Sequence, residues 1–353
     1  MNDAIEIDGS VGEGGGQVLR TSLTLSILTR QPVHIRHIRA KRSKPGLMAQ
    51  HLQAVQSASA ISQAEVKGNT IGSKELSFIP TSITHGRYLF KIGTAGSTSL
   101  VLQTLLLPLS MAERTSTIDI QGGTHVPWSP VFHYLDLHWL EFIRRIGFNV
   151  ELAISKAGFY PLGGGEMSAK INPVDLITGL QLKQRGKLLS IHGISAVGNL
   201  DMTIATRQKH QALRRLEPIY PNTKIKCQEI PAHGKGTFLL LVAEFEEGRC
   251  CFSSLGSPGK RAEIVADEAV DALLVFIDSE ASVDEYLADQ MLLPLILSEQ
   301  SSSFSTSKVT QHLLTNASII HQFTPARIEI DGDLGKPGIV KVTPMPVKRL
   351  PEL

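Results

Sequence analysis

The sequence has 353 residues, of which 42% are hydrophobic and 19% are charged, a balance typical of a soluble globular protein. This length is enough for a large core, and it favours two domains or one domain with a sizeable insertion. Thirty-five basic and 33 acidic side chains give a net charge of +2, which excludes attraction of nucleic acid by overall charge, so any polyanion must meet a local cluster.

Cysteine usage and the N-terminal residues bear on the compartment. The chain has three cysteines, Cys227, Cys250 and Cys251, and this odd number with adjacent members favours neither disulfides nor a zinc site. The first ten residues have no basic and apolar segments of the kind found in secretion signals. We therefore expect a cytoplasmic protein with no membrane segment, and nothing in the sequence predicts an obligate protein partner.

The first half of the chain alternates between predicted strands, glycine-rich turns and helices. A strand at 4–9 leads through SVGEGGG into a helix at 17–28, and a strand at 33–39 precedes a helix that starts just after Pro45. A strand at 87–93 and the loop TAGS precede an apolar helix at 97–112. This helix is shorter than the roughly 20 residues needed to span a bilayer. The strand–turn–helix pattern recurs near Gly14, Gly96 and Gly164, which predicts an α/β fold built from a repeated unit.

The character of the sequence changes between residues 183 and 279. Basic and acidic residues are mixed there with strands such as TFLLLVAEF, and residues 257–277 have the pattern of a helix. We predict an inserted smaller α/β domain at 183–279, and a large domain of three repeated α/β units formed by 1–182 and 280–353.

The loop GEGGGQ, residues 12–17, precedes a helix but matches no standard nucleotide motif. It lacks the GK[ST] ending of a P-loop, and a GxGxxG match fails at Gln17. A flexible loop before a helix still presents backbone N–H groups to an anion. Glu13 would repel phosphate there unless a divalent cation or an arginine such as Arg20 intervenes. A plain glycine turn is the alternative.

Three further segments carry candidate site residues. RAKRSK, residues 39–44, places four cations at the end of a strand, where guanidinium groups can bind phosphate, although charge runs are usually solvated surface. Tyr286 and Asp289 of YLADQ share one face of a predicted helix and could hold a nucleoside, or simply begin that helix. His312 lies near the front of a threonine-capped helix, KVTQHLLTNASII, where a satisfied structural histidine is the alternative to a nucleophile.

Seven motifs occur in an order that resembles the RNA 3′-terminal phosphate cyclase family. They are EGGGQVLR, RAKRSKPGL followed by QH, GTAGSTSLVLQTLLLP, GGT with a downstream proline, GFYPLGGGE, EYLADQ and HLLTN. The resemblance extends from about residue 5 to about residue 343 and is weakest in the inserted region. It departs from the family pattern after GGT, where this chain has His125, Val126 and Trp128.

This resemblance implies a reaction. Enzymes of the family use ATP and a divalent metal, Mg²⁺ or Mn²⁺, to convert the 3′-terminal phosphate of an RNA into a 2′,3′-cyclic phosphate. A histidine takes AMP from ATP, AMP moves to the RNA 3′-phosphate, and the adjacent 2′-hydroxyl then displaces it. The expected partners are therefore ATP and an RNA with a 3′-terminal phosphate.

The resemblance also implies the site residues. His312 is the expected nucleophile, acting with Arg20, Arg42 and Glu13, and Glu13 is the expected metal-facing carboxylate. The family match implies phosphate or RNA binding by Arg39, Gln50 and His51. It implies an ATP site formed by Gln103, Pro130, Tyr286, Leu287, Ala288, Asp289 and Gln290. A neutral imidazole suits this role, because its ordinary pKa of about 6.5 lets it attack phosphorus without a separate base.

Two other classes of protein remain as alternatives. A catalytically inert cyclase-like protein that binds RNA or assists ribosome assembly would have the same scaffold without the nucleophile, and the presence of His312 argues against it. A small-molecule transferase built from a similar repeated unit would need neither this histidine nor YLADQ.

Overall fold

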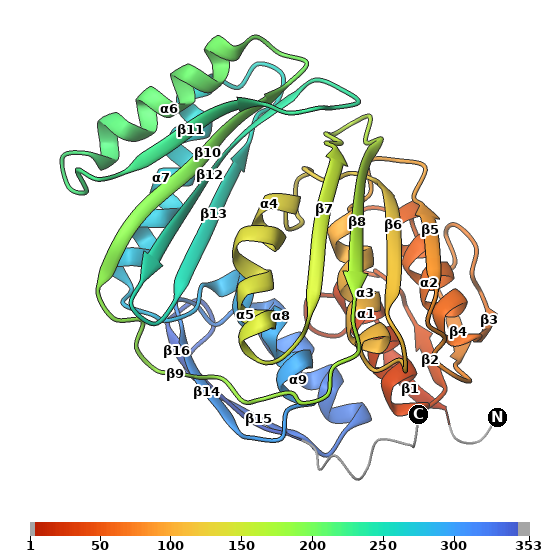
Figure 1. Cartoon of the computed structure of the whole chain (residues 1–353). Coiled ribbons are helices and arrows are strands. Elements are labelled where there is room, and N and C mark those ends of the chain that lie inside the picture. The colour runs from red at the N-terminus through yellow and green to blue at the C-terminus, as the bar shows by residue number, and fades with distance from the viewer. Residues whose placement is uncertain (1–3, 345–353) are drawn as a thin grey trace.

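The computed structural model describes residues 4–344, which form three repeated units and an insert (Figure 1). The first unit pairs its strands in the order β1-β2-β4-β3. Strands β1 and β2 are parallel, and the other neighbours are antiparallel. Its elements are β1 (Ile5–Asp8), α1 (Gly16–Thr29), β2 (Val33–Arg36), α2 (Ala49–Ser62), β3 (Glu65–Lys67) and β4 (Leu76–Ile79).

The second unit repeats this topology, with strand order β5-β6-β8-β7 and one parallel pair, β5 with β6. Its second helix contains a π-helical turn, η1, a feature frequent at functional sites. The elements are β5 (Arg87–Lys91), α3 (Thr98–Ser110), β6 (Ser116–Gly122), α4 (Phe132–Tyr134), η1 (Leu135–Trp139), α5 (Leu140–Arg145), β7 (Val150–Lys156) and β8 (Gly165–Ile171).

The third unit has the equivalent order, β9-β14-β16-β15, again with its first two strands parallel. A long segment separates its first strand from its first helix. The elements are β9 (Gln181–Leu182), α8 (Glu285–Leu295), β14 (Ser302–Thr306), α9 (Gln311–Phe323), β15 (Arg327–Asp331) and β16 (Gly338–Thr343). The identical strand orders confirm the predicted repeat of an α/β unit.

The segment between β9 and α8, which we call the insert, forms a fourth sheet of order β11-β10-β12-β13 with two helices (Figure 1). Its elements are β10 (Leu188–Gly198), α6 (Met202–Leu216), β11 (Lys224–Glu229), β12 (Gly236–Phe245), β13 (Arg249–Leu255) and α7 (Ala262–Asp278). The domain boundaries at 183 and 279 stay a prediction.

Strand β12 explains how the insert joins the rest of the molecule. Its side chains alternate between two hydrophobic cores, because successive residues of a strand point to opposite faces. Phe238, Leu240 and Val242 belong to the core shared with the repeated units. Leu239 and Leu241 belong to a second core with α6 and α7. The uninterrupted apolar run of β12 is therefore buried on both faces of its sheet.

Two local predictions were wrong. Gly164 lies in the turn between β7 and β8, so a strand and not a helix follows it, and the third unit begins instead at β9. Helix α2 begins at Ala49 and not directly after Pro45, because the backbone of Gly46 and Leu47 is bonded to Ile38 and Ser73 in neighbouring loops. Among the helices within residues 4–344, none has the length and apolar character needed to cross a membrane.

Candidate active site

The glycine loop places the start of α1 beside the start of α9. Gly12 and Gly14 adopt positive φ angles of 63° and 61°, which favour glycine. The backbone N–H of Glu13 donates to the hydroxyl of Thr315 in α9, at 3.1 Å. No side chain of the described residues caps α1 at Gly15, so the first N–H groups of this helix are available to an anion.

His312 lies in the first turn of α9, where Thr310 caps the helix by accepting a hydrogen bond from the N–H of Leu313, at 3.1 Å. Its imidazole is exposed to a cavity of about 760 Å³. The ring atom Nδ1 contacts the side-chain oxygen of Gln17. The threonine-capped helix is thus as predicted.

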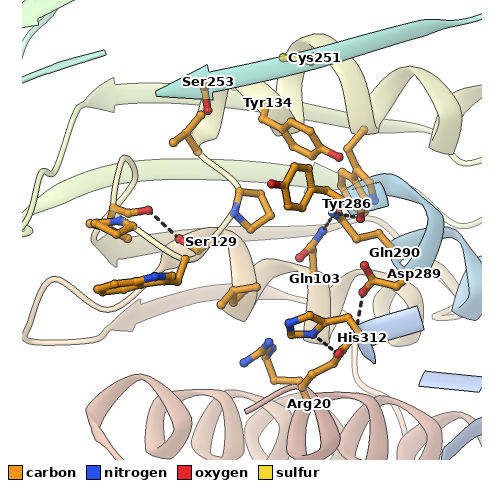
Figure 2. A pocket seen from close by; sticks show the side chains of 18 of the residues that line it. Arg20, Gln103, Ser129, Tyr134, Cys251, Ser253, Tyr286, Asp289, Gln290 and His312 are labelled. Atoms are coloured by element: carbon orange, nitrogen blue, oxygen red, sulfur yellow. Dashed lines mark hydrogen bonds between the residues drawn. The ribbon is translucent and has the colours of Figure 1, made fainter. Parts of the chain in front are cut away.

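The contact with Gln17 fixes the protonation of the histidine. The amide nitrogen of Gln17 donates to the carboxylate of Asp289 at 2.6 Å, so its amide oxygen is the atom that faces His312. A carbonyl oxygen only accepts, and therefore Nδ1 of His312 carries the proton. The other nitrogen, Nε2, keeps its lone pair. Figure 2 shows His312, Asp289 and Arg20 at one end of the cavity.

Burial and positive charge tune the groups around His312. The pKa of His312 lies below its usual 6.5, mainly because of burial and then because of Arg20 and Arg42. Burial also raises the pKa of Asp289 to about 7, against the opposing effects of Gln17 and Arg20. Burial lowers the pKa of Arg20 to about 10, which still leaves its guanidinium charged near neutral pH.

A second set of hydrogen bonds connects α1, α8 and α9. The hydroxyl of Thr21 donates to the side-chain oxygen of Asn316 at 2.6 Å, and the amide of Asn316 donates to the backbone oxygen of Asp289 at 3.1 Å. Since Gln17 also binds Asp289, the residues from three helices hold one another in place. No local pattern in the sequence predicts these roles for Thr21, Asn316 and Gln17, because each contact joins residues far apart in the chain.

Helix α8 forms another wall of the cavity. Asp284 caps it by accepting hydrogen bonds from the N–H groups of Tyr286 and Leu287, both at 2.9 Å. The second carboxylate oxygen of Asp284 contacts Nε2 of His138 at 2.7 Å, and both side chains are fully buried. The amide of Gln103 in α3 donates to the side-chain oxygen of Gln290 at 2.6 Å. Figure 2 shows Tyr286, Gln290 and Gln103 directed toward the cavity.

The residues predicted for the ATP site divide into two groups. Gln103, Pro130, Tyr286, Asp289 and Gln290 line the cavity together with His312 and Arg20. Leu287 and Ala288 are fully buried in the core and are not among the described residues that line it. Helical geometry explains the division, because positions i, i+3 and i+4 share one face and the two residues between them point elsewhere.

Aromatic residues that sequence analysis did not single out also line the cavity. Tyr134 and Trp139 are 5% and 3% exposed. The hydroxyl of Tyr134 and the indole N–H of Trp139 have no hydrogen-bond partner within the described part of the chain. In the sequence both resemble ordinary core positions of a helix, and only their unpaired polar atoms distinguish them.

The predicted phosphate-binding cations lie beside the glycine loop. Arg42 forms an ion pair with Glu13. Arg39 instead donates to backbone oxygens of its own loop, those of Lys44 at 2.7 Å and Gly46 at 2.8 Å. These contacts hold the loop in shape.

The two polar residues of α2 have different surroundings. Gln50 accepts a hydrogen bond from the N–H of Ser97 at 2.9 Å, which joins the first and second units. His51 lies so close to Gly16 that a Cβ at this glycine would be 2.4 Å from its Nε2. Burial, followed by the charges of Arg20, Arg39 and Arg42, lowers the pKa of His51 to about 3. A neutral His51 therefore borders the start of α1.

Glu13 fits the expectation of a metal-facing carboxylate in one respect. Its Oε2 atom is buried and has no hydrogen-bond partner among residues 4–344. The same residues contain no group of three or more histidine, cysteine, aspartate or glutamate side chains that could hold a metal. A single carboxylate suits Mg²⁺, which usually binds one or two carboxylates together with substrate phosphates.

Comparison with known proteins identifies the family. The family model described as RNA 3′-terminal phosphate cyclase matches residues 11–330. The chain belongs to this family. Relatives named RNA 3′-terminal phosphate cyclase include one from Nostoc punctiforme, 40% identical over 93% of this chain and 96% of the relative. Another, from Staphylothermus marinus, is 40% identical over 96% of this chain and 98% of the relative. A third, from Pseudomonas fluorescens, is 44% identical over 93% of this chain and 94% of the relative. For a cyclase-family chain, the cavity with His312 is the natural candidate for the active site.

Proposed function

We propose that this protein is an RNA 3′-terminal phosphate cyclase that consumes ATP and forms a covalent AMP adduct on His312. The observation that carries the proposal is the chain of contacts from Asp289 through Gln17 to Nδ1 of His312. It keeps the proton on Nδ1 and leaves a lone pair on Nε2, in a cavity large enough for a nucleotide. The inert RNA-binding alternative does not account for an imidazole prepared in this way.

In the first step Nε2 of His312 attacks the α-phosphorus of ATP. An N–P bond forms, the bond from phosphorus to the bridging oxygen breaks, and pyrophosphate leaves with the electron pair. The ring retains its Nδ1 proton and gains positive charge, which the oxygen of Gln17 stabilises. Arg20 offsets the negative charge of the phosphates, the main requirement of phosphoryl transfer.

In the second step an oxygen of the RNA 3′-phosphate attacks the same phosphorus. The N–P bond breaks and its electrons return to Nε2, so His312 is regenerated and AMP is joined to the RNA 3′-phosphate. In the third step the adjacent 2′-hydroxyl oxygen attacks the RNA phosphorus, loses its proton to a base and expels AMP. Splitting one dehydration into three transfers lowers each barrier.

Adenosine is proposed to lie between Pro130 and Tyr286, with polar contacts from Gln103, Gln290 and Asp289. These five residues line one cavity with His312. The triphosphate then extends toward Arg20 and the uncapped start of α1. When a divalent metal is bound, Glu13 and phosphate oxygens would hold it, and it would supply further positive charge to the phosphates.

The decisive experiment labels the protein with ATP radioactive at the α-phosphate in the presence of Mg²⁺. We expect an adduct that is stable in alkali and labile in acid, as a phosphoramidate should be. His312→Ala should reduce the labelling to background. His210→Ala, which changes an exposed histidine of α6, is the matched control and should be labelled like the wild type. Equal labelling of His312→Ala and the wild type would refute the proposed nucleophile.

A further inference from the structure

Trp128 is an exposed aromatic side chain at the edge of the candidate active site. It lines the cavity, yet it is 97% exposed. The other tryptophan of the chain, Trp139, is 3% exposed. Such a large apolar surface left in water does not contribute to the core, so packing does not explain this residue.

The loop that carries Trp128 is held at both ends. At the start of the loop, the N–H groups of Thr124 and His125 both donate to the backbone oxygen of Gly158 at 3.0 Å. At its end, the N–H of Phe132 donates to the backbone oxygen of Thr124 at 2.9 Å. The hydroxyl of Ser129 donates to the backbone oxygen of Val126 at 3.2 Å. The indole is thus presented by a firmly anchored loop.

The backbone of this loop points to a ligand as well. Pro127 and Pro130 flank Trp128 and Ser129, and a proline fixes its own φ angle. Trp128 itself has a positive φ of 58°. This conformation is uncommon for a bulky residue, and residues with such strained backbones cluster at active sites and ligand clamps.

The position of the loop indicates which ligand it meets. Ser129 lies across the cavity from Tyr286 (Figure 2), and Pro130 and Tyr286 are the residues proposed to enclose adenine. Trp128 lines the same cavity but, unlike the enclosed residues, is almost fully exposed to water. In the proposed binding mode ATP lies within the cavity, whereas an RNA chain must continue from its 3′-terminal phosphate out into solvent. A side chain at the edge therefore faces the RNA and not the adenine of ATP.

We propose that Trp128 stacks on a nucleobase within the last two nucleotides of the RNA substrate. This inference depends on the proposed function. Stacking on an indole face needs no hydrogen-bond donor or acceptor, and every base has such a face. The contact would therefore tolerate any RNA sequence and would select a nucleic acid end over a free phosphate monoester.

The test compares Trp128→Ala with Trp128→Phe in steady-state cyclisation of a short RNA with a 3′-phosphate. We expect Trp128→Ala to raise the KM for RNA by about 5- to 150-fold, the range that one base–aromatic stack supplies, with a small change in kcat. Trp128→Phe keeps an aromatic face and should restore most of the affinity. An otherwise identical RNA with abasic sites at its last two positions should bind both variants and the wild type with similarly weak affinity.

Two further measurements separate this proposal from its alternatives. Titrating the RNA without ATP should quench tryptophan fluorescence in the wild type and not in Trp128→Phe. Labelling of His312 by ATP in the absence of RNA should be the same in Trp128→Ala and the wild type. If Trp128→Ala leaves the KM for RNA unchanged, or if it impairs labelling by ATP as strongly as it impairs RNA use, the proposed RNA contact is wrong. Failure of the proposed function itself would appear separately, as labelling that persists in His312→Ala.

Discussion

The first helices of the three repeated units occupy equivalent places in the fold, but they begin differently. In the second unit Ser97 caps α3 by accepting from the N–H of Leu100 at 3.3 Å. In the third unit Asp284 caps α8 with two hydrogen bonds of 2.9 Å. In the first unit the corresponding residue is Gly15, with no capping side chain among the described residues. The repeat therefore supplies two helices whose ends are satisfied internally and one whose end is available to a substrate anion.

The difference shows how one structural unit serves two purposes. A capped N-terminus makes its hydrogen bonds within the protein and contributes to stability. An uncapped one makes them only when an anion or water is present, so it contributes to binding. The following predictions test this division.

The largest effect should come from removing the cap of α8. Asp284→Ala removes both capping hydrogen bonds and also leaves the buried His138 without its partner. A lost cap costs about 1 kcal/mol, and an unpaired buried polar group adds about 1–3 kcal/mol. The start of α8 should also shift, which would raise the KM for ATP through Tyr286. Urea unfolding measures the first effect and steady-state kinetics the second.

The cap of the second unit provides the control for this prediction. Ser97→Ala removes a single hydrogen bond and should lower the free energy of unfolding by about 1 kcal/mol. Equal destabilisation by the two substitutions would show that the His138–Asp284 pair has no special importance.

Adding a cap to the first unit should mainly affect activity. In Gly15→Ser the new hydroxyl competes with phosphate for the first N–H groups of α1, and the Cβ displaces Glu13, whose Oε2 atom would be 2.2 Å away. We expect kcat/KM for ATP to fall by about 10²–10³-fold, the usual cost of losing an anion-stabilising donor. The reciprocal change, Ser97→Gly, should leave kcat/KM for ATP within about twofold of the wild type, since a glycine cap costs only a few tenths of a kcal/mol. Comparable kcat/KM values for the two variants would contradict the proposed division.

The smallest effect concerns the influence of the first unit on His312 in the third. The pKa of His312 is lowered, so the ring stays neutral below pH 6.5 until its own pKa is reached, as the proposed attack on phosphorus requires. Arg20→Met removes one repulsive charge and should raise this pKa. Because burial is the main cause of the shift, the pKa should still lie below 6.5. An NMR titration of His312 measures both values, and a wild-type pKa at or above 6.5 would contradict the prediction.

The sequence was sufficient for the general plan of the fold and insufficient for the contacts that define the site. Apolar periodicity and glycine turns predicted the alternation of strands and helices, because both are local properties. The third copy was misplaced at Gly164 because a glycine turn also joins two antiparallel strands. The start of the third unit was hidden, since its first strand, β9, has only two residues.

In the candidate site, too, local motifs were predictable from the sequence and long-range contacts were not. Residues carried over from the family motifs include part of the polar lining of the cavity, such as His312, Arg20 and Gln103. The partner that sets the proton on His312 is Gln17, which is 295 positions away in the chain, and no local pattern links the two. Arg39 and Gln50 make hydrogen bonds with the backbone of the protein, and their binding of phosphate or RNA stays a prediction.

The pairing of β9 with β14 has a consequence for biosynthesis. These strands are parallel neighbours, although the whole insert lies between them in the chain. The ribosome must therefore complete the insert before the third sheet can close, and that closure costs loop entropy. Helix α9 follows β14, so His312 reaches Gln17 only after nearly all of the polypeptide has emerged. An incomplete nascent chain would contain the glycine loop and its arginines and would still lack the histidine proposed to accept AMP.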